Sequence, residues 1–147
     1  MSERYIVPLD GTHLSGVADI ERLCFSSPWS VGSLTLLTMG ENGGFVALDG
    51  KTVVGYIGYL GVIDEYEITN VATHPDYQRQ GIGTALLAAL VEKAKQNGIV
   101  RITLDVRESN TPALALYEKF HFSPCGRRKS FYSAPREDAI VMEWKSR

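Results

Sequence analysis

The chain has 147 residues, of which 44% are hydrophobic and 22% charged, and its formal net charge at pH 7 is −2. This length and apolar content predict a single domain over residues 1–147 with its own core. The nearly balanced charge argues against binding to nucleic acid or a membrane surface through an overall basic field. No apolar run approaches a membrane span and the N-terminal residues lack a signal-peptide pattern, so we expect a cytoplasmic protein. Cys24 and Cys125 lie far apart without zinc-site spacing, so we expect free thiols and no metal.

One strand and two helices are predicted in the first third of the chain. Residues 5–9 are a short strand candidate. Thr12 is expected to cap a helix, and after a break at Pro28 a second helix is expected to run from a cap at Ser30 to Leu37. The first helix is expected to place its apolar residues on one face, namely Leu14, Val17, Ala18 and Leu23.

Three strands are predicted next, over residues 45–48, 52–60 and 67–73. Asp49-Gly50 between the first two is a strong hairpin signal. The second strand contains two glycines, Gly55 and Gly58, which indicate a bulge or the close approach of another backbone. In the third strand, alternation is expected to place Ile68, Asn70 and Ala72 on one face and Glu67, Thr69 and Val71 on the other.

The rest of the chain predicts a helix over residues 83–97, a strand over 101–106, a helix capped by Asn110 or Thr111, and two strands over 127–132 and 139–144. The long helix between two strands predicts a parallel crossover connection. Together these elements predict an α+β (mixed α/β) domain, with a twisted mixed sheet of about seven strands flanked by four helices.

The loop from Gln78 to Gly83 reads Gln-Arg-Gln-Gly-Ile-Gly and leads into the long helix. Its glycines let the backbone approach a ligand closely, and the positive end of the helix dipole favours a phosphate. A P-loop would need a lysine where this chain has Thr84, and a dinucleotide-binding fingerprint would need a third small residue where it has Leu86. Taken alone, the loop indicates either an anion site or a helix start that is simply rich in glycine.

Longer segments resemble the GNAT superfamily of N-acetyltransferases, and within it the ribosomal-protein-alanine N-acetyltransferases (RimI). They are Asn-Val-Ala-Thr-His-Pro-Asp-Tyr-Gln-Arg-Gln-Gly-Ile-Gly at 70–83, Leu-Asp-Val-Arg-Glu-Ser-Asn at 104–110 and Ala-Leu-Tyr-Glu-Lys-Phe at 115–120. The resemblance implies the GNAT fold and acetyl-CoA as the acetyl donor. It implies transfer to a protein N-terminal α-amine, most closely the N-terminal alanine of a small-subunit ribosomal protein. A GNAT enzyme for a small amine or a lysine side chain and a non-catalytic CoA-binding module remain as alternatives. We expect no direct nucleic-acid or membrane contact, and a monomer or weak dimer.

The resemblance also implies roles for individual residues. Asn110 would hydrogen-bond the pantetheine arm of acetyl-CoA, and Tyr117 would lie near the thioester sulfur as general acid. RimI enzymes have a glutamate as general base where this chain has Asp105, whose side chain is one methylene shorter, so contact with the amine through a water is implied. The backbone contacts implied are those of Val71, Ala72 and Thr73 to the pantetheine arm and thioester, and those of Arg79, Gln80, Gly81, Ile82, Gly83 and Thr84 to the pyrophosphate.

The chemistry of acetyl transfer calls for the same kinds of groups. A free α-amine has a pKa near 7.7–8.0 and must lose a proton to attack, which a carboxylate can accept directly or through water. Glu67 is a rival base, because it lies on the strand that leads into the glycine loop. The plainer alternatives are a strand-end carboxylate or helix cap for Asp105, a solvated strand face for Glu67 and a packed core aromatic for Tyr117. Trp29, Phe131 and Tyr132 either line a peptide entrance or pack in the core.

Overall fold

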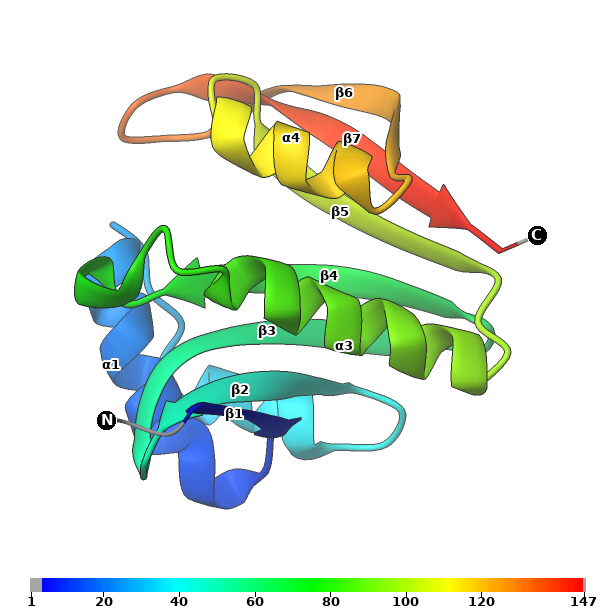
Figure 1. Ribbon diagram of the computed structural model, residues 1–147. Helices are drawn as coiled ribbons and strands as arrows, with labels where there is room; N and C mark the ends of the chain where they lie inside the picture. The colour runs from blue at the N-terminus through cyan, green and yellow to red at the C-terminus, as the bar shows by residue number, and fades with distance from the viewer. Residues whose placement is uncertain (1–3, 147) are drawn as a thin grey trace.

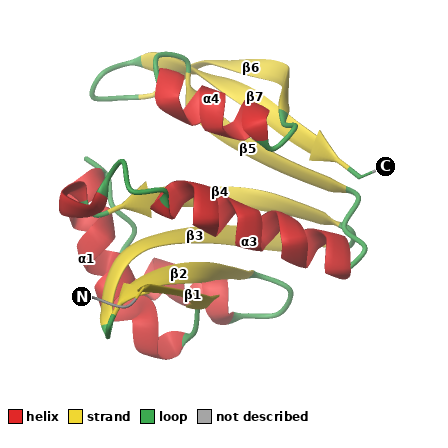
Figure 2. Cartoon of the chain, in the orientation of Figure 1, coloured by secondary structure: helices red, strands yellow, loops and turns green. Residues whose placement is uncertain are grey.

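The computed structural model describes residues 4–146 and contains the predicted order of strands and helices (Figures 1 and 2). Its seven strands form one sheet in the order β1-β2-β3-β4-β5-β7-β6. The strands are β1 Arg4–Pro8, β2 Gly43–Asp49, β3 Thr52–Val62, β4 Glu65–Thr73, β5 Arg101–Arg107, β6 Ser123–Tyr132 and β7 Glu137–Lys145. The helices are α1 Leu14–Cys24, α2 Val31–Leu34, α3 Ile82–Gln96 and α4 Thr111–Lys119. The predicted mixed α/β architecture is therefore confirmed.

Helices cover both faces of the sheet. In Figure 1, α3 and α4 lie in front of the sheet and α1 lies behind it. Leu86 and Leu90 of α3 belong to one buried cluster, and Val17 and Ile20 of α1 belong to another. The central strands are covered on both faces, which is why β3 contributes Ile57 to the first cluster and Tyr56 to the second. Among the helices of the described chain, none is both long and apolar enough to cross a membrane.

The β4 and β5 strands are parallel and are joined by α3, as the crossover prediction required. Their pairing covers only residues 65–67 of β4 and 101–103 of β5. Beyond that point β4 continues to Thr73 paired with β3 alone, and β5 continues to Arg107 paired with β7. The two strands therefore separate in the middle of the sheet, next to the start of α3, as Figure 1 shows.

A bulge in β4 overturns the strict alternation expected for this strand. Gly58 of β3 pairs with Asn70, but the next residue of β3, Tyr59, pairs with Ile68, so Thr69 is an extra residue. Ile68 consequently packs in the cluster below α3, whereas Ala72 packs in the cluster below α1. The prediction that Ile68, Asn70 and Ala72 share a face was wrong, because one inserted residue reverses the side-chain pattern beyond it.

The glycine signal in β3 marked this bulge correctly. A Cβ atom added to Gly58 would lie 2.8 Å from Leu37 Cδ1 and 2.9 Å from Thr69 Oγ1, closer than such contacts allow. A Cβ atom added to Gly55 would lie 3.1 Å from the carbonyl oxygen of Ala72. The close approach inferred from the two glycines is therefore confirmed.

Three details of α1 and α2 differ from the prediction. A 3₁₀ turn over Gly11–His13 leads into α1, and its cap is Asp10, which accepts from the Thr12 N–H at 2.8 Å. The Thr12 hydroxyl donates to the same carboxylate and is not the cap. In α1, Leu23 is 54% exposed, and Glu21 occupies the buried stripe in its place with no exposed surface. The second helix is capped by Ser30 as predicted, but α-helical geometry ends at Leu34 and continues as a 3₁₀ turn over Thr35–Thr38.

Several local predictions are confirmed. Asp49-Gly50 joins β2 to β3, with φ of +62° at Gly50. Gly98 follows α3 with φ of +68°, the left-handed geometry of a helix stop. Asn110 caps α4 by accepting from the Ala113 N–H. Cys24 and Cys125 are both free.

Candidate active site

The glycine loop has the geometry of an anion-binding loop. Arg79 has φ of +64° and Gly81 has φ of +79°, so left-handed residues alternate with ordinary ones just before α3. Such alternation turns successive backbone N–H groups toward a common point. The loop is anchored at its start by the Tyr77 hydroxyl, which donates to Asp49 Oδ2 at 2.7 Å.

The N–H groups of this loop are available to a ligand. The first hydrogen bond of α3 is made by the Ala85 N–H to the Gly81 carbonyl at 3.0 Å. Within residues 4–146, the backbone N–H groups from Arg79 to Thr84 donate to no protein acceptor. Protein packing does not require the second glycine, since a Cβ atom on Gly83 would meet only Leu116 Cδ2, at 3.7 Å. The loop therefore fits a pyrophosphate, because its N–H groups are free and Gly83 leaves room for a ligand at the start of α3.

The end of β4 fits an extended cofactor arm. Residues 71–73 lie beyond the last pair formed with β5, so the strand edge facing β5 is left without a ladder partner there. An extended acyl chain can pair with such an edge as an additional strand would. Asn110 lies at the start of α4; its Oδ1 is used by the Ala113 N–H, and its Nδ2 donates to no described protein group. The residues present therefore fit acetyl-CoA.

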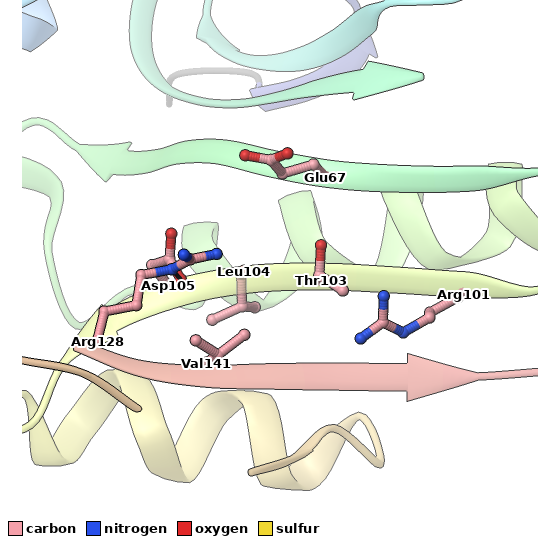
Figure 3. A pocket seen from close by; sticks show the side chains of 7 residues that line it. All are labelled: Glu67, Arg101, Thr103, Leu104, Asp105, Arg128 and Val141. Atoms are coloured by element: carbon pink, nitrogen blue, oxygen red, sulfur yellow. Dashed lines mark hydrogen bonds and ion pairs between the residues drawn. The ribbon is translucent and has the colours of Figure 1, made fainter. Parts of the chain in front are cut away.

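Two carboxylates line a groove on the face of the sheet opposite α3 and α4. Glu67 from β4 and Asp105 from β5 line this groove together with Thr103, Arg101 and Arg128, and its volume is about 130 Å³ (Figure 3). On β5, the alternation predicted from sequence holds: Ile102, Leu104 and Val106 are buried, and Arg101, Thr103 and Asp105 point to the other face. The structure thus brings together the two rival bases.

The two carboxylates differ in their partners. Asp105 Oδ1 accepts from Nε of Arg128 at 3.0 Å, and the Asp105 side chain is 24% exposed. Glu67 is exposed and, within the described chain, its carboxylate forms no ion pair or hydrogen bond. Arg101 is held elsewhere, by Glu65 at 3.2 Å and Glu143 at 2.8 Å. Only Asp105 is therefore oriented by a protein cation, and Glu67 is free to meet a cationic ligand.

Tyr117 lies on α4 in the buried cluster, 7% exposed, and its ring packs against Phe122 with centroids 5.8 Å apart. Burial, and then the nearby Tyr132, raise the pKa of Tyr117 to about 12. The Tyr117 hydroxyl has no hydrogen-bond partner within residues 4–146, yet it is not a fully enclosed polar atom. It can therefore stay protonated at neutral pH and donate to a ligand.

Tyr132 links this tyrosine to the carboxylate groove. Burial, and then Asp105, raise the pKa of Tyr132, and Tyr132 in turn contributes to the raised pKa of Tyr117. Its ring lies under the Arg107 guanidinium, 4.4 Å from centroid to Cζ. Tyr132 therefore interacts electrostatically with both Asp105 and Tyr117.

Two residues of this region were missed from sequence. Arg128 was not assigned to Asp105, because nothing in a strand pattern tells which residue of a distant strand will face it. Glu21 was missed although a signal was present: a carboxylate at the seventh position after Leu14 lies on the same helical stripe as Val17 and Ala18. No cluster of His, Cys, Asp or Glu side chains suited to a metal ion occurs within residues 4–146.

Comparison with known proteins agrees with this geometry. The sequence model of the acetyltransferase (GNAT) family matches residues 14–122. A Bacillus subtilis protein is 38% identical over 128 residues, covering 86% of this chain and 85% of the relative. The [ribosomal protein bS18]-alanine N-acetyltransferase of Escherichia coli K12 is 37% identical over 145 residues, covering 93% of this chain and 94% of the relative.

A solved structure supports the same assignment. The crystal structure of the ribosomal-protein-S18-alanine N-acetyltransferase from Escherichia coli superposes with a TM-score of 0.91 at 32% identity, covering 97% of this chain and 94% of that one. The fold, the glycine loop before α3 and the separated β4 and β5 strands occur together in this chain. The chain belongs to the GNAT family and is an acetyl-CoA-dependent N-acetyltransferase.

Proposed function

We propose that this enzyme acetylates the N-terminal α-amine of a ribosomal protein, with an N-terminal alanine of a small-subunit protein as the preferred acceptor. The names of relatives that align over almost the whole chain support this acceptor. The structural observation that carries the proposal is the groove shared by Glu67 and Asp105, beside the unpaired end of β4. This acceptor would place the reaction in the cytoplasm.

The donor side of the site would be built mainly from backbone. The N–H groups of Arg79 to Thr84 would hold the pyrophosphate, and residues 71–73 with Asn110 would hold the pantetheine arm. Acetyl-CoA supplies an acetyl group already activated as a thioester. A backbone N–H of residues 71–73 would donate to the carbonyl oxygen as it gains negative charge.

The acceptor side would be built from the carboxylate groove. Glu67, which has no protein partner, would attract the cationic form of the terminal amine. Asp105, oriented by Arg128, would accept the proton that the amine loses, through an ordered water because its side chain is short. Tyr117 would donate a proton to the departing thiolate, which otherwise leaves poorly at neutral pH.

A peptide panel tests the acceptor. We expect acetyl transfer to a peptide with a free N-terminal alanine, and none to the same peptide with a blocked N-terminus and an internal lysine. Polyamines should be poor acceptors, because they offer no peptide backbone for the groove to align. Turnover of polyamines or of the lysine side chain alone would contradict the proposal, and acetyl-CoA binding without transfer to any acceptor would indicate a non-catalytic module.

A further inference from the structure

The most deeply buried charged side chain in the described chain is Glu21, in the last turn of α1, with 0% of its surface exposed. Burying a carboxylate in an apolar cluster is costly unless several donors compensate it. The proposed mechanism makes no direct use of this residue. Its three partners come from three different parts of the fold, so the carboxylate of Glu21 connects these parts to one another.

All three partners of Glu21 donate hydrogen bonds. The backbone N–H of Trp29, in the loop between α1 and α2, donates to Oε1 at 2.8 Å. The Tyr56 hydroxyl of β3 donates to Oε2 at 2.6 Å, and the Asn70 side-chain amide of β4 donates to Oε2 at 3.2 Å. The Asn70 amide also donates to the Tyr56 hydroxyl at 3.1 Å, which closes the network. Burial, and then hydrogen bonding to Glu21, raise the pKa of Tyr56 well above its ordinary value, so this hydroxyl remains a donor.

The network meets β4 at the bulge. Asn70 is the residue directly after the inserted Thr69 and directly before the segment proposed to hold the thioester. The Thr69 hydroxyl is buried and has no hydrogen-bond partner within residues 4–146, so the bulge is not held by that side chain. The amide of Asn70 is therefore the side-chain hold on the bulge, and Glu21 is what it binds.

The same helix end also reaches the far end of that segment. The Cys24 thiol lies 3.3 Å from the Thr73 carbonyl oxygen and donates to it. The α1–α2 loop starts at the next residue, Phe25, which is 37% exposed, and continues to Ser30. One turn of α1 thus contacts both Asn70 and Thr73 and carries an exposed loop away from them, and Glu21 binds the backbone of that loop at Trp29.

We propose that Glu21 is a positioning residue for acetyl transfer: its buried carboxylate holds the α1–α2 loop, whose Trp29 would lie at the peptide entrance, in register with the bulged segment of β4 proposed to hold the acetyl group. This inference rests on the proposed function for its catalytic consequence, but the loop anchor itself is a property of the free enzyme. Glu21 would touch neither substrate. It would act through Trp29 and Asn70.

The substitution Glu21→Gln is a sharp test because it preserves shape. A glutamine presents one oxygen and one NH₂ group. With its NH₂ group toward Trp29, the bond to the Trp29 N–H is lost; with its oxygen there, its NH₂ group faces the Asn70 amide, which must turn over and give up its present hydrogen bonds. Either arrangement therefore breaks a hydrogen bond that Glu21 makes to Trp29 or to Asn70. The matched control is Val17→Ala, since Val17 is fully buried on the same helix, and its truncation loosens α1 packing without removing any hydrogen bond of Glu21.

The first measurement needs no acceptor. In a Trp144→Phe background Trp29 is the remaining tryptophan of the two in the chain. We expect Glu21→Gln to raise the quenching of Trp29 fluorescence by acrylamide by about twofold, and Val17→Ala to leave it near wild type, both well below their melting temperatures. Unchanged quenching both in Glu21→Gln and in Glu21→Ala, which leaves the Trp29 N–H no acceptor, would overturn the proposal, whether or not the peptide proves to be the acceptor.

The second measurement separates positioning from stability. We expect Glu21→Gln to raise the peptide KM by about tenfold and lower kcat several-fold while the acetyl-CoA Kd changes by less than about twofold. Equal kinetic losses in Val17→Ala at a matched loss of melting temperature would refute the positioning role. If Glu21→Gln does not fold, Tyr56→Phe removes a single donor and should shift KM in the same direction. Failure of the wild type to acetylate the peptide would count against the proposed function and leave the fluorescence test in force.

Discussion

Nε of Arg128 on β6 lies 3.0 Å from Oδ1 of Asp105 on β5, so the carboxylate proposed as general base is already held by a cation. Across the same groove, Glu67 has no protein partner within residues 4–146. This difference assigns separate roles to the two carboxylates: Asp105 is oriented by Arg128, and Glu67 is open to the incoming amine. The predictions below follow from that division and from the geometry of the donor side.

Asp105→Asn should lower kcat by about a hundredfold or more, because the amide cannot accept the proton from the amine. Glu67→Gln should mainly raise the peptide KM several-fold, because it removes attraction for the cationic terminus. Full pH–rate profiles of both variants check this, with Glu118→Gln on the exposed side of α4 as the control. A normal profile in Asp105→Asn together with a lost one in Glu67→Gln would reverse the assignment.

Arg128→Gln should lower kcat by several-fold in the wild-type background and have almost no further effect on Asp105→Asn, because Arg128 acts only through Asp105. The melting temperature should hardly change, since the Arg128 side chain is 55% exposed and such ion pairs contribute about 0–1 kcal/mol. Arg127→Gln is the control, because Arg127, although next to Arg128 in sequence, pairs instead with Glu108 and Asp138. Additive losses in the double variant would show that Arg128 has a separate role.

Gly83→Asp should weaken acetyl-CoA binding by at least about tenfold, because a carboxylate would stand where the pyrophosphate is expected. The fold should tolerate the change: the new Cβ meets only Leu116 at 3.7 Å, and an acidic group in the first turn of α3 contributes about 0.3–1 kcal/mol of stability. Titration calorimetry and thermal melting check the two parts. Ala88→Asp, on the exposed face of the same helix, should leave affinity unchanged. Full affinity in Gly83→Asp would remove the loop assignment.

Tyr117→Phe should lower kcat by about tenfold with little change in acetyl-CoA affinity, because the hydroxyl is needed only as the thiolate leaves. Loss of the hydroxyl leaves no buried partner unpaired, since it has no hydrogen bond within the described chain. Single-turnover rates and equilibrium binding separate the two quantities. Tyr66→Phe, whose hydroxyl meets Asn97 away from the groove, is the control and should keep its kcat. Undiminished turnover in Tyr117→Phe would leave this tyrosine a packing residue.

Tyr117 should also contribute to alkaline unfolding. Its pKa is about 12 in the folded chain, because burial and then Tyr132 disfavour the phenolate, against an ordinary value of 10. The folded state therefore holds this proton more tightly, so the stability from this group is complete below pH 10 and is lost as the pH rises from 10 through 12. A shift of this size corresponds to about 2–3 kcal/mol. Urea unfolding should thus show a shallower loss of stability between pH 10 and 12 in Tyr117→Phe; an identical slope in both proteins would contradict the assignment.

Local signals predicted most of the fold because each acts over a few residues. The Asp49-Gly50 turn, the Asn110 cap and the stop at Gly98 depend on backbone dihedral angles and side-chain groups within one turn of the chain. The alternation of β5 was predicted correctly for the same reason, since no residue is inserted there. The alternation of β4 was not, because the insertion at Thr69 follows from how β4 pairs with β3.

The candidate site divides along the same line. The glycine loop could be predicted as an anion site because its chemistry lies in consecutive backbone N–H groups, and the family resemblance then supplied the cofactor. The partner of Asp105 could not, because Arg128 is distant in sequence and faces it only through the order of β5, β7 and β6. The hydrogen-bond partners of Glu21 could not be predicted either, for the same reason. Its helical position indicates burial, but its three donors come from separate elements.

The sequence by itself therefore determined the element order, the position of the glycine loop before the long helix and the family motifs, because these depend on short-range backbone geometry and on recognisable residue patterns. Only the tertiary structure decided where β4 and β5 separate, which face the bulge gives to Asn70, and which cation orients Asp105. These depend on contacts between strands and helices far apart in the chain, where the free energy of packing and of burying a charge outweighs any local preference.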